Sequence, residues 1–223
     1  MTQYLDSRGH GLTTSSEQAA KAFNDGMHGF VCWRTDTMDH LDGAMAADPD
    51  FALAKLAKGW ILQTARTAAF HPPIKGLLAE AAPLIETATE REKAYFHGLT
   101  AAVNGDGVGA ATIMEAMLAQ NPTDLLGHRL VQFELFWNGR AAWMREMVER
   151  AAPAWNKDLV DYGCFLSARA FANEEAGHYE PAERHGRDAV EIDPTDCWGT
   201  HAVAHVHAMQ GRVDDGVAWL EGL

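Results

Sequence analysis

The sequence predicts an all-α protein, an α-α superhelix of stacked helical hairpins, and two regularities support this. The first is a duplication. The segment Asn121-Pro122-Thr123-Asp124 recurs in register as Asp193-Pro194-Thr195-Asp196, and a Gly-Arg pair follows each copy at the same distance, Gly139-Arg140 and Gly211-Arg212. The second is that no segment alternates apolar and polar residues with period two for long enough to form a strand.

A shorter period lies within the duplication. Gly177 recurs as Gly211, and Ala170 recurs as Ala204 at the same offset. This offset is the period of tetratricopeptide repeats. Such a hairpin needs small residues where helices A and B touch, a glycine that ends helix A, and a proline that stops helix B. Two segments meet this pattern at equal spacings: Ala170, Gly177, Ala182 and Pro194, and before them Gly98, Gly105, Ala110 and Pro122.

The other elements follow from the N-terminus onward. Thr14-Ser15-Ser16-Glu17 is a capping box that begins a helix with Phe23 on its apolar face. Asp48-Pro49 closes a segment, and His71-Pro72-Pro73 predicts an irregular break before a helix over 77–84. We expect about ten helices of roughly 10–17 residues, forming a single tetratricopeptide-like helical-repeat domain over 1–223.

Composition limits the function classes. The chain has 18 Lys plus Arg against 31 Asp plus Glu, a net charge of −13, so nucleic acid and anionic membrane surfaces are not expected as partners. No apolar stretch reaches the roughly 18 residues of a membrane span, and the N-terminus has no basic start followed by an apolar run. We therefore expect a cytoplasmic protein.

The three cysteines, Cys32, Cys164 and Cys197, have no close pair in the sequence. This spacing gives neither a disulfide framework nor a zinc knuckle, so three small buried residues are the first interpretation. A fold that brings Cys164 near Cys197 would instead create a redox pair.

The last predicted helix, from Val213 to Leu223, has no polar capping helix after it. Solenoids normally end on one, because the final apolar face must be covered. Three explanations remain open: a fragment of a longer solenoid, a homo-oligomer formed through that face, or a partner chain that covers it.

The run from Asp196 to Arg212, with its D-x-W-G-x-H-A-x-A-H motif, and the run from Ala170 to Gly177 resemble the tetratricopeptide repeat protein 38 family of bacteria and animals. The resemblance extends from Thr13 onward. Members of that family are longer, so this sequence resembles their N-terminal half. The resemblance implies an α-α superhelix of tetratricopeptide-like units and no particular activity.

Candidate functional residues lie on the predicted A helices. Trp198, His201 and His205 share one helix face, and the shorter repeat offset places Glu174 and Glu175 on the preceding A helix. Two imidazoles one turn apart can chelate a metal, but Ala202 stands where the zincin motif has its glutamate. The histidines are therefore interpreted as hydrogen-bonding groups of the groove, as metal ligands with a glutamate, or as metal-free acid-base residues. No cofactor and no metal is assigned.

Aromatic residues recur on equivalent A helices, as Phe133, Phe171 and Trp198. Most aromatic residues of helical repeats belong to the core, and those facing a groove suit an apolar ligand. Arg129 occupies the position in the first copy of the duplication that His201 has in the second. It would therefore hold a carboxylate in the groove or form an ion pair with Glu134 or Glu92.

Two functions compete. The first is a binding scaffold that uses the concave helix-A face to hold a peptide or small-molecule ligand through Phe171, Glu174, Glu175, Trp198, His201, His205, Arg129 and Phe133. The second is an enzyme, in its commonest form a metal-dependent hydrolase, with a His201/His205 plus Glu174/Glu175 pocket. The sequence leaves open whether any reaction is catalysed.

Overall fold

The structure is a computed structural model that describes residues 4–222. Within these residues it contains twelve α-helices, two short strands and three 3-10 helices. The strands are β1 (Tyr4–Leu5) and β2 (Gly11–Leu12). The α-helices are α1 (Glu17–Val31), α2 (Thr37–Ala47), α3 (Ala52–Thr64), α4 (His71–Ala81), α5 (Glu90–Val103), α6 (Gly107–Leu118), α7 (Leu125–Trp137), α8 (Ala141–Ala151), α9 (Tyr162–Glu175), α10 (Tyr179–Ile192), α11 (Cys197–Met209) and α12 (Val213–Glu221), and the 3-10 helices are Ala68–Phe70, Ala82–Thr87 and Ala152–Ala154.

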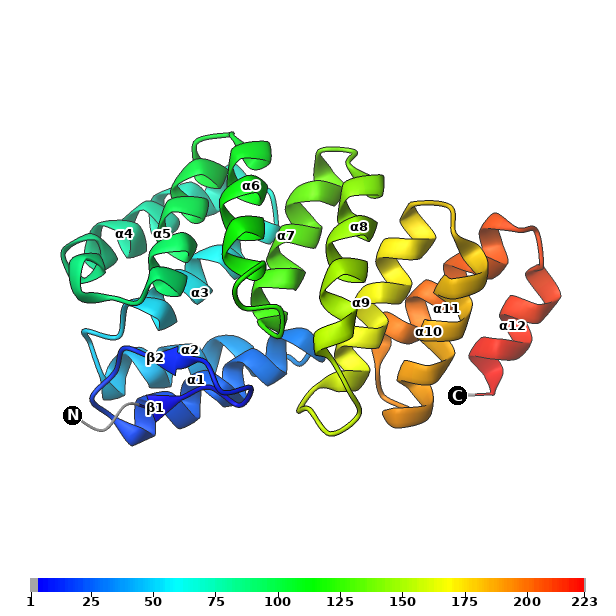
Figure 1. Cartoon of the computed structure of the whole chain (residues 1–223), viewed down its shortest axis with the longest axis horizontal. Coiled ribbons are helices and arrows are strands. Elements are labelled where there is room, and N and C mark those ends of the chain that lie inside the picture. Colours follow the sequence, from blue (N-terminus) through cyan, green and yellow to red (C-terminus); the bar gives the residue numbers. More distant parts are fainter. Residues whose placement is uncertain (1–3, 223) are drawn as a thin grey trace.

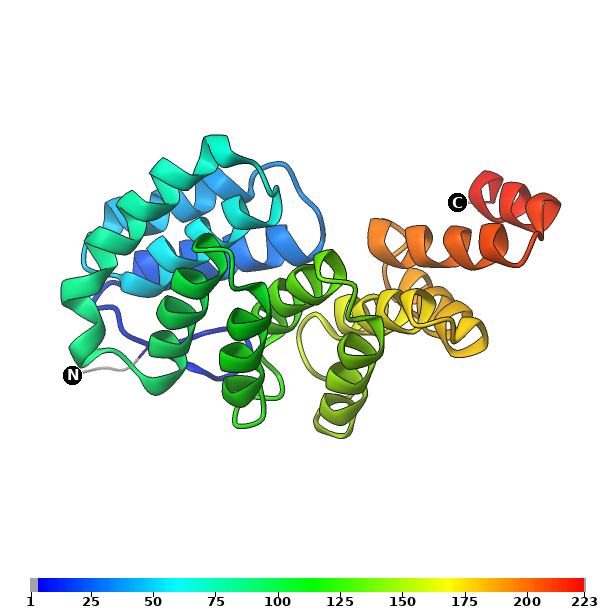
Figure 2. The ribbon, with the colours of Figure 1, turned by 90° about the horizontal axis from the view of Figure 1, so that it is seen from above.

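The protein is an α-α superhelix of tetratricopeptide-like hairpins. From α5 onward, successive helices stack as antiparallel hairpins along the long axis of the molecule (Figure 1). Helices α7, α9 and α11 are the A helices of the last three hairpins, and each contacts the next. The α1–α2 hairpin crosses beside the first half of the stack, and α1 contacts α7. Seen from above, the hairpin of α11 and α12 extends away from the rest of the molecule (Figure 2).

The repeat signals act as the sequence predicts. Gly177 follows α9 with φ +77° and Gly211 follows α11 with φ +70°, the left-handed conformation that ends a helix at little cost only for glycine. Asp124 and Asp196, the equivalent residues of the duplication, both cap their helices. Each accepts a hydrogen bond from the backbone N–H of a glycine one turn later, Gly127 or Gly199.

Three local expectations are wrong. Ser16, not Thr14, caps α1, because the Thr14 hydroxyl donates to Asp48 instead (2.6 Å). Pro72 and Pro73 do not form an irregular break before the helix. They occupy the first turn of α4, where the missing backbone N–H needs no partner. The two strands pair as a small antiparallel hairpin that is too short to produce an alternating sequence pattern.

The main core runs from the N-terminal segment through α8 and also includes Phe171 and Ala172 of α9. Its largest fully buried side chains include Trp60 and Tyr95, and the Trp60 indole N–H donates to the backbone carbonyl of Tyr95 (2.9 Å). A second cluster joins α1 to α9 and includes Val31, Trp155 and Phe165. Trp155 and Phe165 stack with ring centroids 4.3 Å apart.

Within the described residues, no helix is both long enough and apolar enough to cross a membrane. Helix α12 exposes Val213, Val217 and Leu220, each at least half accessible. A contact of another copy or a partner chain through that face stays a prediction.

Three histidines are buried within the described residues, His128, His185 and His207. His185 lies on the buried side of α10 and is 6% exposed. His128 is 1% exposed, and its Nε2–H donates to the carbonyl of Pro122 (3.0 Å). Burial lowers the pKa of His128 to about 4.

His128 should make stability depend on pH. The unfolded chain binds a proton near pH 6.5 and the native histidine only near 4, so stability is lost as pH falls through this interval. We expect His128→Gln to reduce the loss of unfolding free energy between pH 7 and pH 5 by about 2 kcal/mol. Urea unfolding of both proteins at the two pH values measures this difference. Equal losses in the two proteins would mean that His128 binds its proton equally well in the folded and unfolded states.

Candidate functional site

Four aromatic side chains from distant parts of the chain meet around Trp198, in the first turn of α11. The ring centroid of Trp198 lies 4.2 Å from Trp33, 5.8 Å from Phe133 and 6.1 Å from Phe171. Helices α7, α9 and α11 each supply one of these rings, and the loop after α1 supplies the fourth. We call Trp33, Phe133, Phe171 and Trp198 the Trp198 cluster.

Trp33 is the member that sequence reasoning missed, because it lies before the first repeat and belongs to no periodic pattern. It is 59% exposed, whereas Trp198 beneath it is 8% exposed. Its φ of +56° places a bulky residue in the left-handed region, which costs on the order of 1 kcal/mol. The backbone conformation of this loop and the tilted ring contact with Trp198, at an interplanar angle of 39°, together hold an aromatic surface open to solvent.

The two predicted histidines lie beside the Trp198 cluster. His201 and His205 are exposed on α11 with ring centroids 4.1 Å apart, and the His201 ring lies 6.3 Å from Trp198. Val203 and His207 occupy the opposite, buried stripe of the same helix. Burial and the neighbouring His205 lower the pKa of His201.

The predicted carboxylates reach one of these histidines. An oxygen of Glu174 lies 3.6 Å from Nδ1 of His205. Single ligand atoms of Glu174, Glu175 and His205 lie within 4.8 Å of one another. Glu174 is 6% exposed, and its Oε2 has no hydrogen-bond partner within the described residues. Burial and the charge of Glu175 raise the pKa of Glu174, and burial raises that of Glu175. The structure thus joins three of the four predicted polar residues, while His201 stays beside His205.

Arg129 does not line the groove. It is 2% exposed and lies under Trp198, with Cζ 4.9 Å from the ring centroid. It donates to the Ser167 hydroxyl (2.8 Å) and the Cys164 carbonyl (3.2 Å), and burial lowers its pKa. The prediction that Arg129 faces a carboxylate in the groove is therefore wrong, because Trp198 covers the guanidinium.

The alternative role expected for Arg129 is also wrong. Glu134 accepts from Arg66 (2.6 Å), and Glu92 accepts from Thr13 and Thr89. Within the part of the chain that the structure describes, Arg129 forms no ion pair. Its contacts with Trp198 and α9 make it a support for the Trp198 ring.

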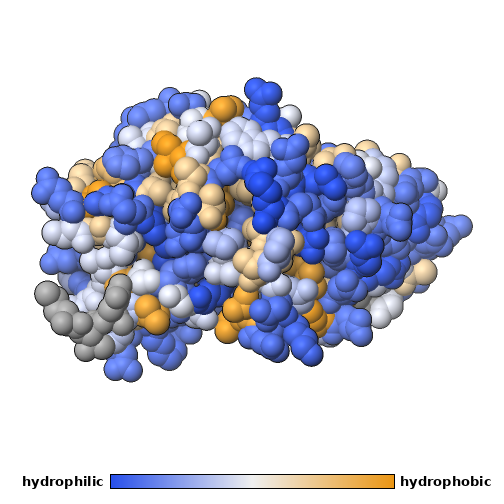
Figure 3. Space-filling view, in the orientation of Figure 1, coloured by the Kyte–Doolittle hydropathy of each residue, from blue (hydrophilic) through white to orange (hydrophobic). Residues whose placement is uncertain are grey.

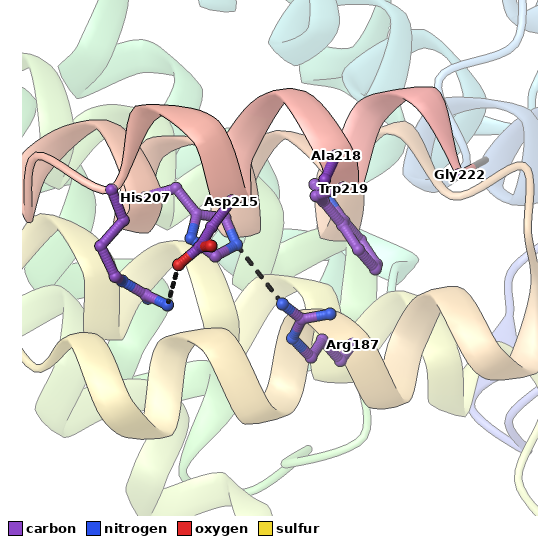
Figure 4. Close-up of a pocket in the computed structure, with 7 residues that line it drawn as sticks. Arg187, His207, Asp215, Ala218, Trp219 and Gly222 are labelled. Atoms are coloured by element: carbon purple, nitrogen blue, oxygen red, sulfur yellow. Dashed lines mark hydrogen bonds and ion pairs between the residues drawn. The ribbon is translucent and has the colours of Figure 1, made fainter.

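Cavities lie elsewhere on the molecule. One of about 360 Å³ lies between α10 and α12, where the Arg187 guanidinium covers the Trp219 ring at 4.7 Å and faces His207 (Figure 4). Another of about 700 Å³ lies beside the β-hairpin and is lined by Leu12 and Asp48 among others. Neither contains a residue of the Trp198 cluster. Hydrophilic side chains cover most of the face in Figure 3, with apolar patches between them.

No known protein-family model matches this chain. A solved structure described as "MamA AMB-1 C2221" is similar over 75% of this chain and 95% of its own, with 14% sequence identity and a TM-score of 0.47. The tetratricopeptide-like fold described above therefore rests on the helices and turns of this structure itself.

Proposed function

We propose that this chain is a binding scaffold that holds a peptide or small-molecule ligand on the concave face of its A helices. The observation that supports this most is the exposed Trp33 packed against Trp198, with the carboxylates of Glu174 and Glu175 on the neighbouring helix. A ligand with a basic group next to an apolar one matches this surface.

The chemistry of the surface favours a cation. An ammonium or guanidinium group on the face of a tryptophan gains about 0.5–2 kcal/mol. The buried Oε2 of Glu174 accepts no hydrogen bond from the described residues and has the 3.6 Å contact with Nδ1 of His205, so it gains a donor when a basic group arrives. Because Arg129 is covered by Trp198, it does not oppose such a ligand at the surface. The net charge of −13 would also steer a basic partner toward the protein.

Fluorescence anisotropy tests this proposal with two labelled peptides, one alternating Lys with Leu and one alternating Glu with Leu. We expect the basic peptide alone to bind, and Trp33→Ala and Glu175→Gln each to weaken it about tenfold. Trp137→Ala is the matched control, since Trp137 is 56% exposed at the end of α7 and outside the Trp198 cluster. Equal binding by the two peptides, or equal loss in the control, would contradict the proposal.

His205→Ala should weaken binding of the basic peptide without unfolding the protein. The side chain is exposed and leaves no core cavity, so we expect a change in unfolding free energy within about 0.5 kcal/mol. Thermal unfolding checks this, and a large drop in melting temperature would assign His205 to the fold instead.

The convergence of Glu174, Glu175 and His205 within 4.8 Å favours a second candidate, a metal-dependent hydrolase. Elemental analysis of protein purified without an affinity tag distinguishes the two. One equivalent of zinc, iron or manganese that disappears in both His205→Ala and Glu175→Gln would support the enzyme. Metal-free protein that still binds the basic peptide would support the scaffold.

We also propose that the chain is a single helical-repeat domain related to the tetratricopeptide repeat protein 38 family. The D-x-W-G-x-H-A-x-A-H motif supports this, since its residues form the start of α11 at the Trp198 cluster.

A further inference from the structure

Two cysteines that lie 132 residues apart in the sequence meet where α1 ends and α9 begins. Cys32 directly follows α1, and Cys164 lies in the first turn of α9. Their Sγ atoms are 3.0 Å apart. Cys164 is buried and Cys32 is partly accessible, whereas Cys197, the partner considered from sequence, is exposed on α11.

A histidine and an aspartate adjoin this pair. Nδ1 of His28, one helical turn before Cys32, lies 3.7 Å from the Cys32 sulfur and 2.7 Å from Oδ1 of Asp161. The other oxygen of Asp161 accepts from Arg8 (2.6 Å), and both of those side chains are buried. Two more charges act on this group: Arg34 lowers the pKa of His28, and the buried Asp196 raises the pKa of Cys32. Asp161 therefore orients the imidazole toward Cys32.

The two thiols differ in acidity. The hydrogen bond from the Cys164 thiol lowers the pKa of Cys32, burial opposes this, and the charge of His28 lowers it further. The same contact and burial raise the pKa of Cys164. Burial alone would lower the pKa of His28, but the hydrogen bond to Asp161 raises it. A partly accessible thiol with a lowered pKa thus lies next to a buried thiol with a raised pKa, which is the usual arrangement of an attacking and a resolving cysteine.

We propose that Cys32 and Cys164 are a reversible redox pair that forms a disulfide between α1 and α9 by exchange with a low-molecular-weight disulfide. The Cys32 thiolate attacks one sulfur of the external disulfide and releases the first thiolate. That thiolate takes the proton of Cys164, whose sulfur then attacks the Cys32 sulfur and releases the second thiolate. The second thiolate takes up a proton from solvent, which replaces the proton that Cys32 lost to solvent when it ionised. Two protein thiols lose two electrons and the external disulfide becomes two thiols. The Sγ atoms must approach by about 1 Å to reach bonding distance.

The same residues raise the question of a metal site, because ligand atoms of His28, Cys32 and Asp161 lie within 4.8 Å of one another. The buried guanidinium of Arg8 on Asp161 opposes a metal cation there. A pair of thiols needs no metal cation, so the contacts favour redox chemistry between Cys32 and Cys164.

The disulfide would also act on the neighbouring loop. Trp33 follows Cys32 directly and packs against Trp198, so a bond from Cys32 to α9 would hold Trp33 in place. This consequence rests on the proposed binding function, but the redox pair does not.

The test is titration of the full chain with oxidised glutathione, followed by denaturation, alkylation with iodoacetamide and intact mass. We expect two of the three cysteines to lose alkylation, a non-reduced peptide linking Cys32 to Cys164, and reversal by dithiothreitol. Cys197→Ser should behave the same way. Cys164→Ser should stop at a mixed glutathione disulfide on Cys32, and Cys32→Ser should not react at Cys164.

Three results would overturn the proposal: continued alkylation of Cys32 and Cys164 at excess oxidised glutathione, a linked peptide containing Cys197, or one equivalent of zinc protecting both cysteines until a chelator removes it. The role of His28 has a separate readout. His28→Gln should slow alkylation of native Cys32 at pH 7 at least about threefold, with the exposed Cys197 as internal reference, and an unchanged rate would exclude that role.

Discussion

Asp124→Asn is expected to lower the free energy of unfolding by about 3 kcal/mol, because it leaves a buried cation short of its partner. The Asp124 carboxylate is fully buried and accepts from Arg91 Nε (2.6 Å), the Tyr95 hydroxyl (2.8 Å) and the Gly127 N–H (3.0 Å). Asparagine keeps the helix cap but loses the charge, so Asp6 (2.9 Å) is the carboxylate that remains paired with Arg91. Urea unfolding at pH 7 measures the difference.

The effect should disappear in acid. Burial alone would raise the pKa of Asp124, but the charge and hydrogen bond of Arg91 lower it well below its ordinary value. Stabilisation by Asp124 is therefore complete above the unfolded-state pKa near 4 and is lost as pH falls toward the native pKa. The difference between wild type and Asp124→Asn should shrink progressively below pH 4, and a constant difference would contradict the ion pair.

The repeat supplies a matched control at Asp196, the equivalent residue in the second copy of the duplication. Asp196 caps α11 through the Gly199 N–H (2.8 Å), and its other oxygen has no partner within the described residues. Burial raises its pKa, so its charge opposes folding at neutral pH. Asp196→Asn should be neutral or slightly stabilising. A loss as large as that of Asp124→Asn would assign both effects to capping.

Gly186→Val should cost about 3 kcal/mol, the upper part of the range for overpacked cores. A Cβ at Gly186, in α10, would lie 2.6 Å from a methyl group of Val203 and 3.0 Å from the backbone oxygen of Gly199 in α11. Val203 can rotate but the backbone cannot, so α10 and α11 must separate. Thermal and urea unfolding would both detect this loss.

Gly76→Ala is the control for this substitution. Gly76 also lies within a helix, α4, but a Cβ there meets no atom within 4 Å. Alanine is the better helix former, so we expect about 0.5–1 kcal/mol of stabilisation. If both glycine substitutions destabilise the protein equally, close packing of α10 on α11 is not the cause.

The repeats made much of the second half of the fold predictable. The shorter period identified the turn glycines Gly177 and Gly211, and the duplication made Asp124 and Asp196 equivalent, although only the structure shows that both cap helices. The helical spacing of Trp198, His201 and His205 placed them on one face. The repeat offset placed Glu174 on the preceding A helix, and the structure brings it to 3.6 Å from His205. Each of these signals is local or repeats at a fixed distance.

The first third of the chain has no such period, and its elements were predicted less well. Pro72 and Pro73 have the same sequence signature whether they interrupt a helix or occupy its first turn. Thr14 and Ser16 are both good caps, and only the position of Asp48 decides that Thr14 binds elsewhere. The burial of Arg129 under Trp198 likewise depends on a ring contributed by another helix.

The sequence by itself determined the helical hairpins and the composition of the A-helix face, because helix periodicity, capping and turn glycines act over a few residues. Only the tertiary structure decided that α1 lies along the A helices. That packing brings Trp33 onto Trp198 and Cys32 to Cys164. Contacts between such distant segments arise from burial of the apolar face of α1. This burial decides which residues meet in space, but it produces no regular interval in the sequence from which the contacts could be predicted.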